Sequence, residues 1–110
     1  MPKILLIAAA LVAIPAAAFA ADATPVAANT AVVEIHGMKF NPTTLSIATG
    51  TKVTWVNEDE QPHTVTDRGK VFRSAALDTK DSFSYTFTAP GEFTYFCTIH
   101  PMMVGKIVVR

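Results

Sequence analysis

Cysteine is nearly absent from this 110-residue sequence: Cys97 is the only one, so no disulfide can form within the chain. Charge of one sign is not in excess either, because nine Lys and Arg face nine Asp and Glu, and no charge run suggests a tail. This balance argues against a nucleic-acid-binding face. The region after residue 30 also lacks an internal repeat and a long helical period, which argues against repeat and helical-bundle architectures.

One long hydrophobic run is present, and it predicts export. Lys3 precedes an apolar stretch from Ile4 to Ile14, and the small-residue site Ala18-Phe19-Ala20 follows. This pattern is typical of a secretory signal peptide, with an uncleaved membrane anchor as the alternative. We therefore expect a signal peptide at residues 1–20, a flexible lead-in at residues 21–30, one domain at residues 31–110, and a periplasmic location without stable membrane insertion.

The sequence after residue 30 predicts short strands. Val33 and Ile35 alternate with outward-facing Glu34 and His36, and the same period-2 pattern recurs through the chain between turn residues. Residues 68–80 show no period and are expected to form an irregular connection. Seven or eight short strands with turns every 8–12 residues indicate an all-β fold, an antiparallel β-sandwich.

Three side chains that can bind a soft metal lie within seven residues near the C-terminus. Cys97 follows the aromatic strand residues Phe93 and Tyr95, His100 comes three residues later, and Met103 three residues after that. Strand alternation points Cys97 into the core, so that His100 and Met103 lie on the loop that follows. A buried, inert thiol is the alternative for Cys97, but a lone cysteine in an exported protein also suits a metal ligand.

A fourth ligand must come from elsewhere, and the candidates are His36 and His63. His63 follows the turn NEDEQP, where its side chain can point to one end of the sandwich, whereas His36 is expected on the solvated surface. Two imidazoles, one thiolate and a weak axial thioether describe a blue-copper site. Such a set leaves no open position for substrate, and the sequence has no Ser/His/Asp pattern, so we expect no enzyme activity.

Two stretches contain these residues: TKVTWVNEDEQPHTV (51–65) and GEFTYFCTIHPMMVGKIVV (91–109). Over residues 31–110 the chain resembles the plastocyanin/amicyanin group of cupredoxins, and its short Cys-x-x-His-x-x-Met loop is most similar to amicyanin. The resemblance implies an eight-stranded Greek-key sandwich that binds one copper ion, cycling between Cu(I) and Cu(II). Carried over by motif, the equatorial ligands are His63, Cys97 and His100, and the axial ligand is Met103.

The resemblance also implies a function, that of a monomeric one-electron carrier. Redox partners, such as a dehydrogenase or a cytochrome, would dock transiently around His100, Pro101 and Met102, with Pro62 completing an apolar collar. Copper trafficking or storage is the alternative, because the sequence HPMM offers a second thioether beside the ligands.

Other expectations concern residues near the site. Thr64 stands where many relatives have Asn, and its backbone N–H is expected to donate to the Cys97 sulfur. Ile99 stands where relatives have Pro, so its N–H could add a second donor. The acidic turn Glu58–Glu60 is expected to be solvated. Met38 is expected to fill core space, and the Tyr95 hydroxyl to find a hydrogen-bond partner.

Overall fold

The computed structural model describes residues 29–110, which form eight strands and no helix. The strands are β1 (Thr30–Ile35), β2 (Phe40–Asn41), β3 (Thr44–Ile47), β4 (Lys52–Asn57), β5 (Thr66–Asp67), β6 (Ser82–Thr86), β7 (Gly91–Phe96) and β8 (Val104–Val109). The predicted signal peptide and most of the lead-in lie outside the described residues, within which no helix could span a bilayer.

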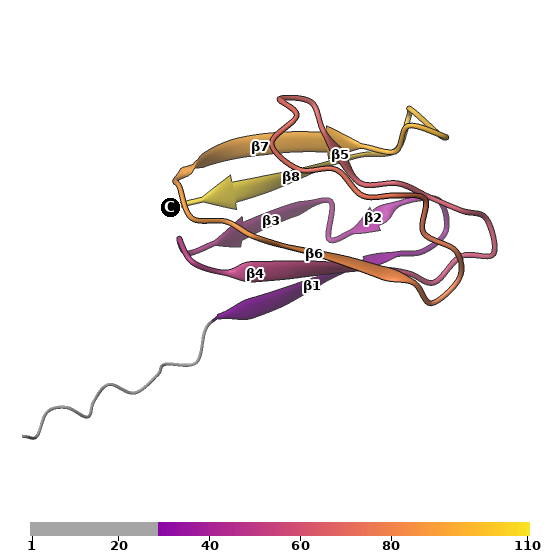
Figure 1. Ribbon diagram of the computed structural model, residues 1–110, viewed down its shortest axis with the longest axis horizontal. Coiled ribbons are helices and arrows are strands. Elements are labelled where there is room, and N and C mark those ends of the chain that lie inside the picture. The colour runs from indigo at the N-terminus through magenta and orange to yellow at the C-terminus, as the bar shows by residue number, and fades with distance from the viewer. Residues whose placement is uncertain (1–28) are drawn as a thin grey trace, which may run out of the picture.

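The strands form two four-stranded sheets packed face to face (Figure 1). One sheet has the order β2-β1-β4-β6 and the other the order β3-β8-β7-β5. The predicted β-sandwich of about eight strands is confirmed, and the sheets are mixed: four pairings are antiparallel, whereas β1 pairs with β4 and β3 with β8 in parallel. The parallel pairings arise because the chain crosses between layers, so that strands distant in sequence become neighbours.

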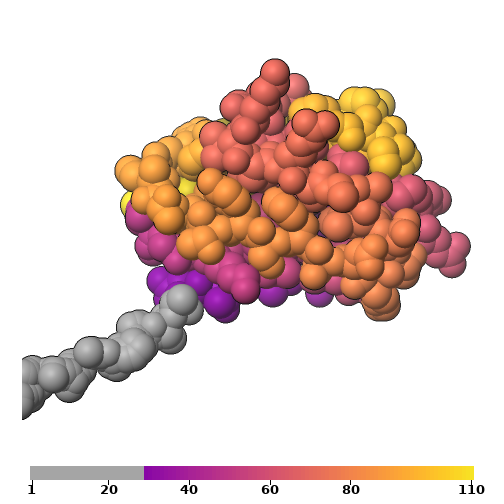
Figure 2. All heavy atoms as spheres, viewed as in Figure 1, coloured from indigo at the N-terminus to yellow at the C-terminus, as the bar shows by residue number. Residues whose placement is uncertain are grey.

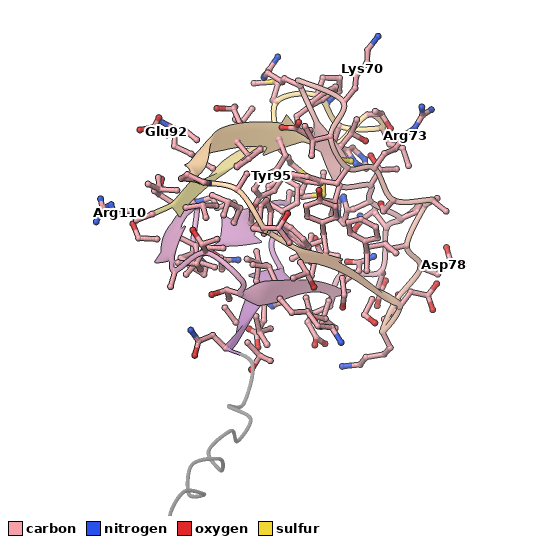
Figure 3. The ribbon with its side chains drawn as sticks, turned by 60° about the vertical axis from the view of Figure 1, so that its left-hand side comes forward. Lys70, Arg73, Asp78, Glu92, Tyr95 and Arg110 are labelled. Carbon is pink, nitrogen blue, oxygen red and sulfur yellow. The ribbon has the colours of Figure 1, made fainter. Side chains whose placement is uncertain are left out.

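The apolar faces of both sheets meet in an aromatic core. Val33, Ile35, Val53 and Trp55 are buried, as their alternation predicts. The Trp55 and Tyr95 rings pack edge to face between the sheets, with centroids 5.4 Å apart, and Tyr95 lies near the centre of the molecule (Figure 3). Burial of the aromatic rings stabilises the fold, since each ring removes a large apolar area from water.

The expected partner for the Tyr95 hydroxyl is not found. Neither that hydroxyl nor the Trp55 indole N–H makes a hydrogen bond of normal geometry among the described residues, although both are buried. Burial raises the pKa of Tyr95 to about 12, and the nearby indole N–H opposes this rise without reversing it. The prediction was wrong because the opposing β8 position, Gly105, offers Tyr95 space but no polar side chain.

Residues 68–80 form the irregular connection that the sequence predicts. The segment pairs with the rest of the fold through two isolated bridges, Thr66 with Arg73 and His63 with Leu77. The second bridge holds the backbone of His63 through two hydrogen bonds, of 3.1 and 2.7 Å. This pairing fixes the first histidine of the predicted site although it lies outside any regular strand.

Candidate metal centre

His63, Cys97 and His100 meet at one end of the sandwich. Their ligand atoms all lie within 4.8 Å of one another. Among residues 29–110, these three side chains form a group close enough together to hold a metal ion. Cys97 directly follows β7, and His100 lies on the loop between β7 and β8. His63 and Cys97 have no exposed surface, whereas His100 is partly exposed.

The spacing of these atoms fits a bound metal. The Cys97 Sγ lies 3.8 Å from the His63 Nδ1 and 3.7 Å from the His100 Nδ1. With metal–sulfur and metal–nitrogen bonds of about 2.3 and 2.05 Å, ligand atoms at 120° would lie about 3.8 Å apart. One thiolate and two imidazoles at this spacing suit copper, because sulfur favours Cu(I) and imidazole serves both oxidation states.

Met103 closes the loop that contains His100. Its backbone N–H donates to the His100 carbonyl at 2.9 Å, and its carbonyl accepts from the Cys97 N–H at 3.1 Å. The residue is only 5% exposed. These bonds hold Met103 beside the two other loop residues of the predicted ligand set, and its role as the axial ligand remains a proposal.

Asp59 contacts the metal cluster, although the sequence predicts that it is solvated with the rest of its turn. Its side chain is 11% exposed, and its Oδ2 accepts a hydrogen bond of 2.9 Å from the His63 Nε2. The backbone N–H groups of Gly37 and Met38 also donate to this carboxylate, at 2.8 and 2.9 Å. An acid that accepts from Nε2 keeps the proton there and leaves Nδ1 free to bind a metal.

The contacts of Asp59 also favour its charged form. Burial alone would raise its pKa, but the amide bonds from Met38 and Gly37 and the interaction with His63 outweigh burial, so the pKa lies below its ordinary value of 3.8. The carboxylate therefore stays ionised at neutral pH, next to a ligand that will share the charge of a metal cation.

Two backbone amides donate to the Cys97 sulfur, and one of them differs from the expectation. The Thr64 N–H lies 3.3 Å from Sγ, as predicted, but the second donor is the His100 N–H at 3.4 Å rather than that of Ile99. The Thr64 hydroxyl also accepts from the Thr98 N–H at 2.7 Å, so it joins the two ligand segments. The sulfur is thus held by donors on both sides.

A shallow hollow surrounds the exposed edge of His100. It is lined by Met38, Ile99, His100, Pro101, Met102 and Met103. Met102 is 95% exposed, and Met38 is 38% exposed rather than in the core, because a backbone φ of +62° turns it outward. Pro62, expected in this collar, is exposed but does not line the hollow. His36 is exposed and outside the metal cluster, as predicted.

Comparisons with known proteins agree with this geometry. The cupredoxin-like domain family matches residues 3–109. Amicyanin of Paracoccus denitrificans is 39% identical over 93 residues, which cover 80% of this chain and 71% of the relative. Plastocyanin of a Synechococcus strain is 36% identical over 105 residues, which cover 78% of this chain and 77% of the relative.

The same family is found among solved structures. The structure of an oxidised amicyanin variant superimposes with a TM-score of 0.71 at 36% identity, covering 77% of this chain and 86% of that one. Fold, donor set and sequence therefore lead to one assignment. The chain belongs to the cupredoxin family, in the amicyanin and plastocyanin group, and its cofactor is one copper ion.

Proposed function

We propose that the protein is a mobile one-electron carrier, exported to the periplasm, with His63, Cys97, His100 and Met103 as its copper ligands. The observation that carries this proposal is the donor set, in which a thiolate and two imidazole nitrogens lie within 4.8 Å of one another and only His100 is partly exposed. When bound, copper supplies a couple that gains or loses one electron. A site closed by four protein ligands leaves no position for a substrate, so chemistry at the metal itself is disfavoured.

The surrounding residues suit this role because they hold the ligands in place. Asp59 orients His63, and the Thr64 and His100 amides fix the Cys97 sulfur. A ligand set held by such bonds rearranges little between oxidation states, which keeps the barrier to electron transfer low.

The hollow around His100 is the proposed port for the electron. His100 is the ligand with an exposed edge, and the apolar side chains of Ile99, Pro101 and Met102 lie around it. A small apolar surface of this kind suits the brief docking of a redox protein, because transient complexes bury little area. The monomeric state that we propose leaves this surface free.

An absorption spectrum tests the proposal. Copper-loaded, oxidised protein should be intensely blue from thiolate-to-copper charge transfer, and colourless when reduced. Cys97→Ser should abolish the colour, and His36→Ala, which changes an exposed histidine outside the cluster, should keep it. A blue Cys97→Ser variant or a bleached His36→Ala variant would contradict the ligand assignment.

Copper trafficking is the second candidate, and the exposed thioethers of Met102 and Met38 beside the site favour it. The two functions differ in how readily copper leaves. A carrier should cycle reversibly in voltammetry and retain copper against a chelator, whereas a trafficking protein should lose Cu(I) to the same chelator within the time of mixing.

A further inference from the structure

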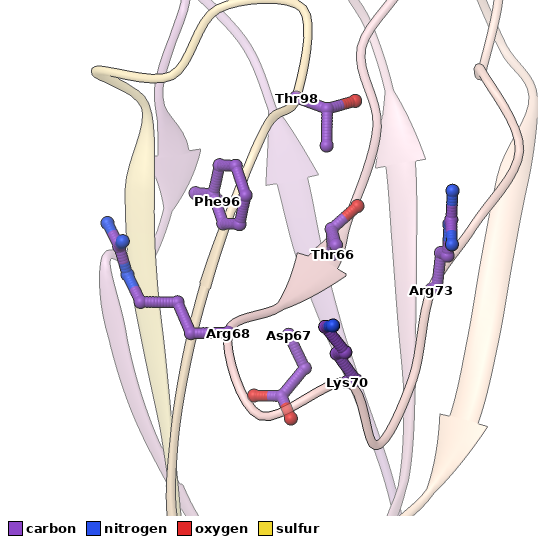
Figure 4. A pocket seen from close by; sticks show the side chains of 7 residues that line it. All are labelled: Thr66, Asp67, Arg68, Lys70, Arg73, Phe96 and Thr98. Carbon is purple, nitrogen blue, oxygen red and sulfur yellow. The ribbon is translucent and has the colours of Figure 1, made fainter.

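A groove separate from the hollow around His100 lies beside the metal centre, and none of the proposed copper ligands lines it. Its volume is about 380 Å³, and Figure 4 shows the side chains that line it. The lining residues are Thr66, Asp67, Arg68, Lys70, Arg73, Phe96 and Thr98. We call it the basic groove, because three of these seven residues are cationic.

The charge that the basic groove presents to solvent is positive. Arg68, Lys70 and Arg73 are exposed, and within residues 29–110 none of them forms an ion pair. In Figure 4, Arg68 and Arg73 stand on opposite sides of the groove, and Lys70 lies between them at one end. The single acid of the lining, Asp67, is only 3% exposed, so the three cations are the charged groups of the groove that solvent and a partner can reach.

The turn that presents these cations is braced from within. The Asp67 Oδ2 accepts from the Val71 N–H, and the Asp67 carbonyl accepts from the Lys70 N–H, each at 3.0 Å. Lys70 itself has a φ of +67°, a conformation that a non-glycine residue keeps only where its surroundings fix it. The Arg68 guanidinium lies 5.0 Å from the centre of the Phe96 ring, which positions its charge. A preorganised surface loses less entropy when it binds.

The basic groove adjoins the hollow around His100. Thr98 lines the groove, and Ile99, the next residue, lines the hollow. In Figure 2 the loop of residues 68–73 projects at the top of the molecule, next to the atoms of the loop that follows β7. A protein that covers the exposed edge of His100 would therefore reach the groove as well.

The charge pattern selects one kind of occupant. The whole chain is balanced, with nine basic and nine acidic residues. A groove with three cations that form no ion pair among the described residues is therefore a local feature. A nucleic acid would need a longer basic stripe, because each neutralised phosphate adds only a small increment to binding. A few carboxylates on a protein surface match three cations around a groove of this size.

We propose that the basic groove binds carboxylate side chains on the surface of a partner protein that docks over His100. The groove speeds the encounter and selects acidic partners, while the apolar hollow makes the close contact. That this partner is a redox protein rests on the proposed function, whereas the preference for acidic side chains rests on the groove alone.

A labelled hexaglutamate peptide tests the groove directly. Its binding is measured by fluorescence anisotropy at low salt, with the protein both free of copper and loaded with copper. Arg73→Gln should weaken binding by about two- to five-fold, the usual range for losing one exposed charge pair. Lys52→Gln is the matched control, because Lys52 is an exposed lysine on the other sheet and forms no ion pair with the residues that the structure describes. Lys70 is left unchanged because its positive φ would complicate the result.

The outcomes separate clearly. Weakening confined to Arg73→Gln, with amide NMR shifts at residues 66–73 on adding peptide, supports the proposal. Equal weakening in both variants, or shifts elsewhere on the surface, would overturn it, as would tighter binding of a hexanucleotide DNA at the same residues. If the peptide binds the groove but the copper-loaded protein is not blue, the groove stands and the electron-carrier function fails.

Discussion

Replacing Asp59 by asparagine tests how the acid behind His63 acts on the metal centre. The Asp59 Oδ2 accepts hydrogen bonds from both the His63 Nε2 and the Met38 N–H. An amide NH₂ in that place would face two donors, and His63 could avoid the conflict only by moving its proton to Nδ1, the atom that would bind copper. Turning the amide over would move the conflict to the Gly37 N–H, which donates to the Oδ1 atom.

The expected loss follows from the kind of hydrogen bond that is replaced. A bond to a charged group contributes about 1.5–3 kcal/mol and a neutral one about 0.5–1.5, so the substitution removes roughly 1–2 kcal/mol. This corresponds to copper binding that is about five- to thirty-fold weaker. It agrees with the roughly 10–100-fold usual for residues that orient metal ligands.

The lost negative charge should also change the redox potential. At an effective dielectric constant of about 20, a unit charge roughly 7 Å from the metal would favour Cu(II) over Cu(I) by at most about 2.4 kcal/mol. Because the Asp59 side chain is 11% exposed, solvent screens part of this effect. Asp59→Asn should therefore raise the midpoint potential.

Chelator competition and voltammetry measure both effects, and Glu60→Gln is the matched control. Glu60 is the next residue, is exposed, and makes no side-chain hydrogen bond within residues 29–110. The Glu60→Gln substitution removes one negative charge from the same turn, as Asp59→Asn does, but it leaves the hydrogen bond to His63 in place. Copper affinity and potential that are equal in the two variants would refute the idea that Asp59 acts through its bond to the imidazole.

The sequence was sufficient for the strands because their signal is local. Side chains alternate across a strand with period 2, so that Val33 and Ile35 had to share a face whatever the strand paired with. The partner of each strand is not a local property. The alternation of β1 does not reveal that β1 pairs with β4 in parallel as well as with β2. This pairing depends on where the chain crosses between the two layers.

The same distinction explains what could be predicted at the metal centre. Cys97 and His100 lie on one short loop, where spacing alone brings their side chains together. Asp59 lies in a turn of acidic residues that looks solvated, and it is drawn inward by amides 21 and 22 residues earlier in the chain. Met38 and Ile99 were misjudged for a related reason. The direction of a side chain or an amide in a loop depends on single backbone torsions, such as the φ of +62° at Met38, which composition does not encode.

Three further predictions address the fold and the site. Copper at about a hundred times its dissociation constant should raise the free energy of unfolding by about 2.7 kcal/mol, and coincident melts of apo and loaded protein in calorimetry would indicate adventitious binding. Ile99→Pro and Ile99→Ala should shift the midpoint potential equally, because the His100 N–H donates to the Cys97 sulfur and the Ile99 N–H does not. A lower potential in the proline variant alone would show that the Ile99 amide reaches the sulfur after all. Gly105→Ala should destabilise the fold by at least about 1–3 kcal/mol, as overpacking does in well-packed cores. Its Cβ would lie 2.5 Å from the Tyr95 hydroxyl oxygen and closer still to a ring carbon, and Tyr95 has no exposed surface, so relief requires a shift inside the core. Chemical unfolding measures the loss, and a Gly105→Ala variant as stable as the wild type would mean that the two central strands can separate without cost.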